Sequence, residues 1–219
     1  MKTRLGKRLR ALFEAIPEHG YDSVWDLCCD HGRLGMALLE TDRTPWVHFN
    51  DSVPGILIDL EERLRRYGAE HYQLHTGPAE ALALPDAGKH LLVLAGVGDE
   101  LTVRILQSLS QHKTSAQFDW LLMPTHNLFQ VRQFLIDQNW GLLEEGWVFE
   151  NGRGYEWLRV TPAGGQRLEN PAPFWDARNA EHRQHLTKLL KHARQQQRQT
   201  DSADAGIIAQ AYAAALDQS

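Results

Sequence analysis

The sequence predicts an α/β protein built on an open, mainly parallel sheet with helices on both faces. Three observations predict this class. Segments with β-type and helical patterns alternate, the apolar run Leu91–Ala95 is typical of a strand buried on both faces, and Asn151-Gly152 joins two β-type runs as in an antiparallel hairpin. With 219 residues and 42% hydrophobic content, the chain can bury one principal core and carry an appendage.

An amphipathic helix is expected at residues 4–16, where apolar residues recur at helical spacing. We expect it to cover one edge of the sheet. Seven strands are expected, the first around Asp26 and the others at residues 46–50, 71–75, 91–95, 118–123, 141–150 and 155–160. The intervening helices are expected at residues 34–39, 56–67, 101–109 and 128–136.

A domain boundary is expected near residue 165, because Thr161–Gly165 and Pro171–Pro173 are rich in helix and strand breakers. Residues 1–165 would form the main domain, with an N-terminal helix in residues 1–18, and residues 166–219 a helical appendage. We expect two antiparallel helices there, with apolar stripes formed by Phe174, Trp175, Leu186, Leu189, Leu190 and Ala193, and by Ile207, Ile208, Ala211, Tyr212, Ala215 and Leu216.

The histidine and cysteine content bears on whether the chain can hold a metal ion or form a disulfide. His182 and His185 have the spacing of metal ligands, but no cysteine or carboxylate cluster accompanies them, so we expect them to be exposed and predict no metal site. The two cysteines, Cys28 and Cys29, are adjacent and too close for ordinary disulfide geometry. They are expected to be buried small residues at a strand end.

Charge and hydropathy bear on location and partners. No apolar run is long enough to span a bilayer, and the N-terminus lacks the apolar core of a signal peptide, so we expect a cytoplasmic protein with no membrane partner. The net charge is −5, yet basic residues gather in the first ten residues and in residues 178–198. These two stretches form either a phosphate-binding face or ordinary solvated helix faces.

The segment from Val24 to Gly35 is a strand that turns sharply into a helix, a junction that directs N–H groups and a positive helix dipole at a ligand. In a dinucleotide-binding G-x-G-x-x-G loop, glycines let the backbone approach a pyrophosphate. Here Cys28 and Asp30 replace the first two glycines, and only Gly32 remains. Because an aspartate would repel a pyrophosphate, the loop favours a cofactor with a positive centre and an amino-acid end, such as S-adenosyl-L-methionine. A junction without any ligand is the alternative.

Asp51 follows the second predicted strand, about twenty residues after the first motif, as in a βαβ nucleotide-binding unit. An acidic side chain at this strand tip can accept hydrogen bonds from both ribose hydroxyls. Its position relative to the first motif favours ribose binding. Capping of the helix that begins near Pro54 is the alternative.

These motifs resemble those of the bacterial tRNA adenine-22 N1-methyltransferases. The family motifs D-I-G-S-D-H-A and I-A-G-M-G-G are similar to Asp26–Gly32 and Leu94–Asp99. Two later motifs, Q-P-x-x-N…R-x-W-L and E-E…E-x-x-x-x-Y-E, are similar to Met123–Asn127 with Arg132 and Leu135, and to Glu144, Glu145, Glu150, Tyr155 and Glu156. The resemblance runs from the first helix to about Val160. It implies a Rossmann-like class I methyltransferase with a seven-stranded sheet and a C-terminal helical hairpin.

The resemblance also implies roles for individual residues. Asp26, Asp30, His31 and Gly32 would line the methionine end of the cofactor, Asp51 the ribose, Ala79 the adenine edge, and Gly96 with Val97 the floor near the methyl group. Cys28 replaces a glycine of the motif and would alter the cofactor rim, and Val97-Gly98-Asp99 replaces Met-Gly-Gly, so a divergent branch is expected. Asn127 would face the target base, unless Pro124 and Asn127 only form a strand-ending turn.

The function expected from these residues is S-adenosylmethionine-dependent methylation of N1 of an adenine in tRNA. The N1 lone pair can attack the methyl group directly, so alignment matters more than a strong base. Asp30 or Asn127 could accept hydrogen bonds from the adenine as positive charge develops, and the base must be unpaired or flipped. The alternatives are a methyltransferase acting on a small molecule or a protein, and a noncatalytic RNA-binding or partner-binding protein. The sequence does not indicate an oligomeric state.

Overall fold

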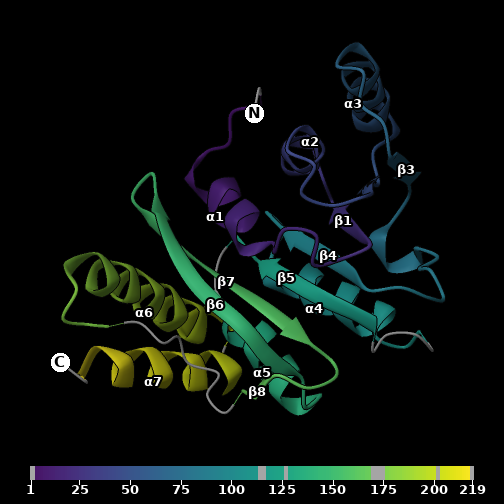
Figure 1. Cartoon of the computed structure of the whole chain (residues 1–219). Coiled ribbons are helices and arrows are strands. Elements are labelled where there is room, and N and C mark those ends of the chain that lie inside the picture. The colour runs from purple at the N-terminus through teal and green to yellow at the C-terminus, as the bar shows by residue number, and fades with distance from the viewer. Residues whose placement is uncertain (1–2, 113–116, 126–127, 169–175, 201–202, 218–219) are drawn as a thin grey trace.

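The computed structural model describes residues 3–112, 117–125, 128–168, 176–200 and 203–217. The described residues form an eight-stranded sheet in the order β3-β2-β1-β4-β5-β7-β6-β8 (Figure 1). The strands are β1 (Ser23–Leu27), β2 (Val47–Asp51), β3 (Tyr72–Thr76), β4 (His90–Ala95), β5 (Phe118–Met123), β6 (Gly141–Glu150), β7 (Arg153–Thr161) and β8 (Gln166–Arg167).

The first five strands are parallel, and the last three are joined to them by antiparallel pairing. This confirms the predicted Rossmann-like α/β class, with all seven expected strands. The short β8 is an addition that pairs with β6 just beyond residue 165, while the domain boundary at that residue stays a prediction.

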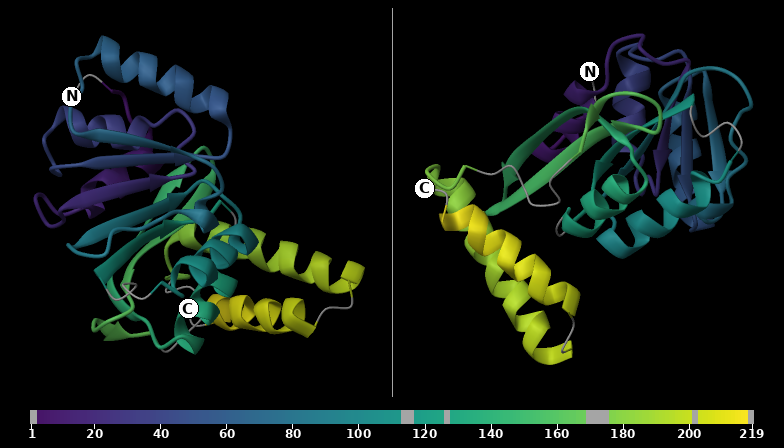
Figure 2. Two further views of the ribbon diagram at one scale, coloured as in Figure 1. Left: turned by 90° about the vertical axis from the view of Figure 1, so that its right-hand side faces the viewer. Right: turned by 90° about the horizontal axis from the view of Figure 1, so that it is seen from below.

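Helices cover both faces of the sheet (Figures 1 and 2). One face carries α1 (Lys7–Ala15), α2 (Arg33–Glu40) and α3 (Pro54–Arg66), and the other carries the 3₁₀ helix η1 (Ala79–Ala81), α4 (Asp99–Leu109) and α5 (Phe129–Asp137). The apolar run Leu91–Ala95 lies in strand β4, which is buried on both faces of the sheet. Leu91 and Val93 belong to the core on the α1–α3 side, while Leu92 and Leu94 belong to the core on the α4–α5 side.

Helix α1 lies across a face of the sheet, so the expectation that it covers an edge is wrong. Its buried Leu12 joins a core that includes Val24 of β1 and Trp157 of β7, and the helix packs between α2 and β6. The β6–β7 hairpin widens the sheet beyond β5 and supplies the apolar surface that the stripe of α1 buries. A strand edge would have offered mainly backbone groups.

The C-terminal helices α6 (Ala180–Thr200) and α7 (Ala203–Asp217) lie side by side and project from the sheet (Figure 2). They pack on Phe129 and near Trp147. Most of the expected apolar stripe is buried or partly buried, but Ile207 is 56% exposed because Ile208 and Tyr212 define the buried side of α7. Phe174 and Trp175 lie outside the described residues. No helix in the described part of the chain is long and apolar enough to cross a membrane.

His182 and His185 are buried, with 8% and 7% exposure, so the expectation that they are exposed is wrong. His182 accepts a hydrogen bond from the Asp176 N–H and packs edge-on against Trp147. His185 accepts one from the Gly154 N–H, and burial lowers its pKa to about 4. Both histidines therefore connect α6 to neighbouring segments, His182 to Asp176 and Trp147 and His185 to Gly154. Among the described residues no group of three potential ligands could hold a metal ion.

Candidate active site

The loop between β1 and α2 has an unusual backbone. Cys28 and Asp30 have φ angles of 51° and 48°, and Gly32, the N-cap of α2, has φ 60°. These are the positions that glycines occupy in a dinucleotide-binding loop, and non-glycine residues adopt this left-handed conformation at a cost. The surrounding contacts impose the conformation. The Cys29 N–H donates to the Asn50 carbonyl, and the Gly32 N–H donates to the Cys29 carbonyl.

Cys28 and Cys29 are half-buried free thiols rather than fully buried residues. Cys28 packs against the core on the α4–α5 side and Cys29 against the core on the α1–α3 side. Burial, with nearby carboxylates, raises the pKa of the Cys28 thiol to about 11 and that of Cys29 still further. Both residues are therefore protonated packing residues at neutral pH and poor nucleophiles.

Asp26 brings a buried carboxyl group to the end of β1. Its Oδ2 accepts a hydrogen bond of 3.1 Å from the Gly35 N–H in the first turn of α2. Gly35 itself allows α2 to approach β2, because a Cβ there would lie 2.2 Å from the Phe49 ring. Desolvation raises the pKa of Asp26 to about 7, and the charge of Asp51 adds to the rise, while the Gly35 hydrogen bond opposes it. Asp26 therefore titrates close to neutral pH.

Asp51 connects the loops that follow β1 and β2. Its Oδ2 accepts a hydrogen bond from the Asp30 N–H and its Oδ1 accepts one from the Val53 N–H, each at 3.0 Å. Val53, not Asp51, is the N-cap of α3, and it makes no side-chain capping bond. Each carboxylate oxygen can still accept another hydrogen bond. The side chain is therefore held in place at the position where the sequence predicts ribose binding.

A cavity of about 450 Å³ opens at this end of the sheet. It is lined by five of the predicted site residues, Asp26, Cys28, Asp30, His31 and Gly96. Gly32, Asp51, Ala79 and Val97 are not among its lining residues, although Asp51 touches the loop through its bond to Asp30. Asn127 lies outside the described residues.

Ala79 and Val97 occupy supporting positions. Ala79 is buried in the core where η1 begins. The Val97 carbonyl accepts a hydrogen bond from the Thr125 N–H, which joins the loops that follow β4 and β5. Neither residue lines the cavity beside Asp26.

Arg8 and Glu150 are among the lining residues that were not assigned to the site from the sequence. Arg8, from α1, stacks over the Tyr155 ring at 4.5 Å, and its Nε is buried without a hydrogen-bond partner among the described residues. Glu150 accepts a hydrogen bond from the Lys7 N–H at 2.6 Å, which ties α1 to β6. The basic charge of α1 is evident from the sequence, but its position beside the loop is not, since only packing brings α1 there.

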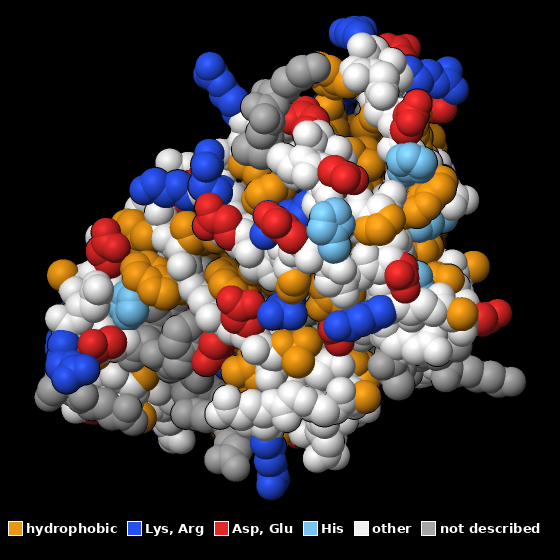
Figure 3. Space-filling model, in the orientation of Figure 1, with side chains coloured by type: hydrophobic (Ala, Val, Ile, Leu, Met, Phe, Trp, Pro, Cys, Tyr) orange, Lys and Arg blue, Asp and Glu red, His pale blue; other side chains and the backbone are white. Residues whose placement is uncertain are grey.

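The charges around the cavity have both signs. Asp26, Asp30 and Glu150 supply carboxyl groups, and Arg8 and Arg33 supply guanidinium groups. Figure 3 likewise shows acidic and basic side chains interspersed on the face that it displays, rather than one continuous basic patch. A ligand that carries both an ammonium group and a carboxylate would match such a mixed lining.

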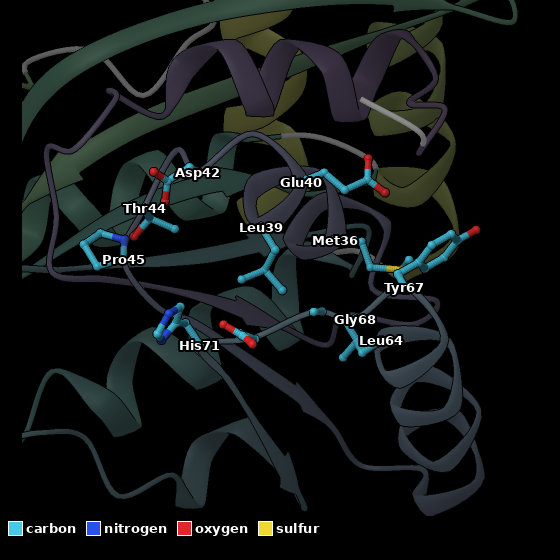
Figure 4. A pocket seen from close by; sticks show the side chains of 12 residues that line it. Met36, Leu39, Glu40, Asp42, Thr44, Pro45, Leu64, Tyr67, Gly68 and His71 are labelled. Atoms are coloured by element: carbon cyan, nitrogen blue, oxygen red, sulfur yellow. The ribbon is translucent and has the colours of Figure 1, made fainter.

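A second cavity, of about 350 Å³, lies between α2 and α3 and is lined by Leu39, Glu40, Tyr67 and His71 among others (Figure 4). Thr44 and Pro45 of its lining precede β2, and His71 precedes β3, so this cavity lies at the amino ends of the parallel strands. Ligands of open α/β sheets bind at the carboxyl ends. The cavity beside Asp26 is therefore the candidate active site.

The comparison with known families decides the chemistry. A family model described as a methyltransferase domain matches residues 5–158, which include every lining residue of the cavity beside Asp26. The chain belongs to this methyltransferase family. The match begins before α1, so the helix that carries Arg8 is part of the methyltransferase domain.

Similar proteins extend the match to the C-terminal helices of this methyltransferase. A putative tRNA methyltransferase of Mycoplasma pneumoniae is 24% identical over 167 residues, 73% of each chain. The B. subtilis m1A22 tRNA methyltransferase TrmK has a TM-score of 0.76 and 20% identity, covering 99% of this chain and 97% of its own. Streptococcus pneumoniae Sp1610, a putative tRNA (m1A22) methyltransferase in complex with S-adenosyl-L-methionine, has a TM-score of 0.76 and 20% identity, with 97% and 100% covered. The fold is therefore shared over nearly the whole chain.

Proposed function

We propose that this methyltransferase transfers a methyl group from S-adenosyl-L-methionine to N1 of an adenine in tRNA. The observation that carries the proposal is the cavity at the end of β1, where the carboxyl group of Asp26 and the guanidinium of Arg8 line the same space. The amino-acid end of the cofactor carries an ammonium group and a carboxylate, and would pair with both. The printed descriptions of the Mycoplasma, B. subtilis and S. pneumoniae proteins support the same cofactor and substrate.

The residues present fit the cofactor. Arg8 Nε is a buried donor without a described partner, which a carboxylate could satisfy. A Cβ built on Gly96, which has φ +80°, meets no neighbour closer than Arg8 Nη2 at 3.8 Å, so the backbone leaves open space there. We assign Asp26, Cys28, Asp30, His31 and Gly32 to the amino-acid end, Asp51 to the ribose, Ala79 to the adenine edge, and Gly96 with Val97 to the floor below the methyl group.

Catalysis in this proposal depends on alignment and electrostatics. The cofactor supplies a methyl group on a positively charged sulfur. The loop from Cys28 to Gly32, held by the hydrogen bond from the Asp30 N–H to Asp51, and the Asp51 carboxylate would hold the cofactor in place for the acceptor base. Asp30, whose side chain is 70% exposed, can accept hydrogen bonds from the adenine and stabilise the positive charge that forms on it. Asn127 is proposed as a second acceptor on the base.

The C-terminal helices are proposed to bind the phosphate backbone of tRNA. Lys191, Arg194 and Arg198 of α6 are exposed and line a shallow groove of about 400 Å³. Lys188 has a different role, because its Nζ donates to the Gly152 carbonyl at 2.7 Å and holds α6 on the β6–β7 turn. Cations spaced along one side of a helix suit a backbone of phosphates. A cytoplasmic location, where tRNA is available, belongs to this proposal.

The deciding experiment incubates the protein with S-adenosylmethionine labelled on its methyl group and with unmodified tRNA, and then identifies the labelled nucleoside. We expect 1-methyladenosine. A tRNA transcript with every candidate adenine paired serves as control, because its N1 atoms are hidden in the Watson–Crick edge. Labelling of a protein or small molecule instead of tRNA would favour the alternative acceptor. Cofactor binding without any transfer would favour a noncatalytic role.

A further inference from the structure

Helix α1, which carries Arg8 to the cavity, begins with an unfavourable first turn. Its N-cap, Gly6, makes no side-chain capping bond, and the turn contains no acidic residue. Instead, the cations Lys7, Arg8 and Arg10 lie at the positive end of the helix dipole. A helix start that lacks both a capping acceptor and a negative charge tends to fray. The position of Arg8 therefore needs support from elsewhere in the chain.

Glu150, at the end of β6, supplies both missing features. Its Oε1 accepts the hydrogen bond of 2.6 Å from the Lys7 N–H, the first N–H of α1. Its carboxylate thereby brings a negative charge to the positive end of the helix. Gly6 permits the close approach, because a Cβ there would lie 2.8 Å from the same oxygen. Glu150 thus caps α1 from 143 positions away in the sequence.

The β6–β7 hairpin makes a second contact with α1, at Arg8 itself. Arg8 stacks over the ring of Tyr155, which is paired with Val148 in the hairpin, two residues before Glu150 in β6. At the other end of the side chain, Arg8 Nη2 is the atom nearest to a Cβ built on Gly96, at 3.8 Å. Arg8 therefore extends from the hairpin toward the loop that follows β4, and both Arg8 and Glu150 line the cavity.

The turn that follows Glu150 is anchored by α6. Lys188 Nζ donates a hydrogen bond to the Gly152 carbonyl at 2.7 Å, and the Gly154 N–H donates one to His185 Nδ1 at 3.3 Å. Because these bonds restrict the backbone beside Glu150, its carboxylate is held close to the start of α1 at a smaller cost in conformational entropy. The hairpin can therefore act as a fixed support for the first turn of the helix.

We propose that Glu150 is a positioning residue for cofactor binding, which caps α1 and so holds Arg8 where it meets the carboxylate of the amino-acid end. The inference rests on the proposed function, in which Arg8 pairs with that carboxylate. Glu150 is itself negative and would repel the carboxylate, so it acts through α1 and not by contact with this group. Loss of the cap should therefore weaken only those ligands that have the amino-acid end.

The test compares two ligands by isothermal calorimetry. S-adenosyl-L-homocysteine has the amino-acid end, and 5′-methylthioadenosine lacks it but keeps the adenosine and the sulfur. In Glu150→Ala we expect the Kd of S-adenosyl-L-homocysteine to rise about tenfold and that of 5′-methylthioadenosine to change less than about twofold. Glu150→Gln keeps an acceptor for the Lys7 N–H, so it should raise the first Kd by no more than about threefold.

Glu144→Ala is the matched control. It removes a carboxylate from the same strand, where Glu144 pairs with Arg159 at 2.9 Å and does not line the cavity. This variant should bind both ligands like the wild type. An equal loss of affinity for both ligands in Glu150→Ala, or an unchanged Kd for S-adenosyl-L-homocysteine, would overturn the inference.

The double variant Glu150→Ala/Arg8→Met tests whether Glu150 acts through Arg8. It should bind S-adenosyl-L-homocysteine no more weakly than Arg8→Met alone. Fully additive losses would mean that Glu150 contacts the ligand directly, which would overturn the positioning role. A wild-type protein that binds neither ligand would overturn the proposed cofactor site and this inference together. A wild-type protein that binds S-adenosyl-L-homocysteine but leaves tRNA unmodified would overturn only the proposed acceptor, and the calorimetry then still decides the role of Glu150.

Discussion

The backbone N–H of Asp30 donates a hydrogen bond to Asp51 Oδ2 at 3.0 Å, across 21 positions of sequence. This bond joins the tips of β1 and β2 and holds Asp30 in its left-handed conformation. The ribose-binding candidate thereby also shapes the loop around the amino-acid end of the cofactor. A substitution at Asp51 should therefore affect both the predicted ribose site and the conformation of the loop after β1.

We expect Asp51→Asn to weaken cofactor binding by about 1 to 2 kcal/mol, because charge-assisted hydrogen bonds to the ribose become neutral ones. Asparagine keeps one oxygen for the Asp30 or Val53 N–H, so the free energy of unfolding should fall by less than the binding energy. Isothermal calorimetry and chemical denaturation measure the two quantities. Equal affinity in a folded variant would remove Asp51 from the cofactor site.

Arg8→Met should weaken cofactor binding by roughly 10- to 100-fold, the range expected when a hydrogen-bonded charge pair is lost. Methionine keeps much of the packing on Tyr155. Arg10→Met is the matched control, since Arg10 is exposed on the same helix and does not line the cavity. A similar loss of affinity in both variants would mean that α1 acts through its general charge or its stability.

Cofactor affinity should increase as pH rises from about 5.5 to 8, because the Asp26 carboxyl, with its pKa raised to about 7, must ionise to pair with an ammonium group. Without cofactor the sign is opposite. The folded state holds the Asp26 proton more tightly than the unfolded state, so its contribution to stability is complete below about pH 4 and is lost as pH rises through about 7. Asp26→Asn should flatten both pH profiles, whereas unchanged profiles would contradict a titrating Asp26.

Acid should destabilise the protein through His48, whose pKa burial lowers to about 4. The neutral His48 ring stacks on Trp25 with the ring centres 3.9 Å apart, and its Nδ1 lies 3.0 Å from His75 Nε2. A depressed histidine pKa contributes stability above the unfolded value of about 6.5, and this is lost as pH falls toward 4. Denaturation midpoints of His48→Phe should depend less on pH between 6.5 and 4, while the exposed His31→Gln should behave like wild type.

The double variant Lys191→Gln/Arg194→Gln should bind tRNA with a shallower salt dependence, by roughly 0.7 to 0.9 in log–log slope for each phosphate contact removed. Cofactor affinity should stay unchanged. Arg65→Gln/Arg66→Gln on α3 removes the same charge from exposed positions on another helix and is the control. If the α6 variant keeps the wild-type slope, tRNA binds elsewhere.

The local sequence patterns determined most of the fold. Apolar runs and turn residues located every main strand, because a strand buried on both faces must be apolar throughout and a tight hairpin needs residues such as Asn151 and Gly152 that tolerate positive φ. The residues of the turn after β1 also indicated where the cavity lies. Cys28 and Asp30 line it, and they adopt the positive φ of the glycines that they replace. These features depend on neighbours in sequence and can be recognised without the rest of the chain.

Only the tertiary structure decided which distant side chains meet. Arg8 lines the site because the β6–β7 hairpin widens the sheet and α1 packs across the face of that wider sheet. His182 and His185 are buried because α6 packs near the same hairpin. Tyr212 became buried for a related reason, through the packing of α7 on Phe129. Helical spacing shows which side of a helix is apolar, but the surface that covers it comes from residues far along the chain, and burial by that surface sets the charge and hydrogen bonding of the side chains beneath it.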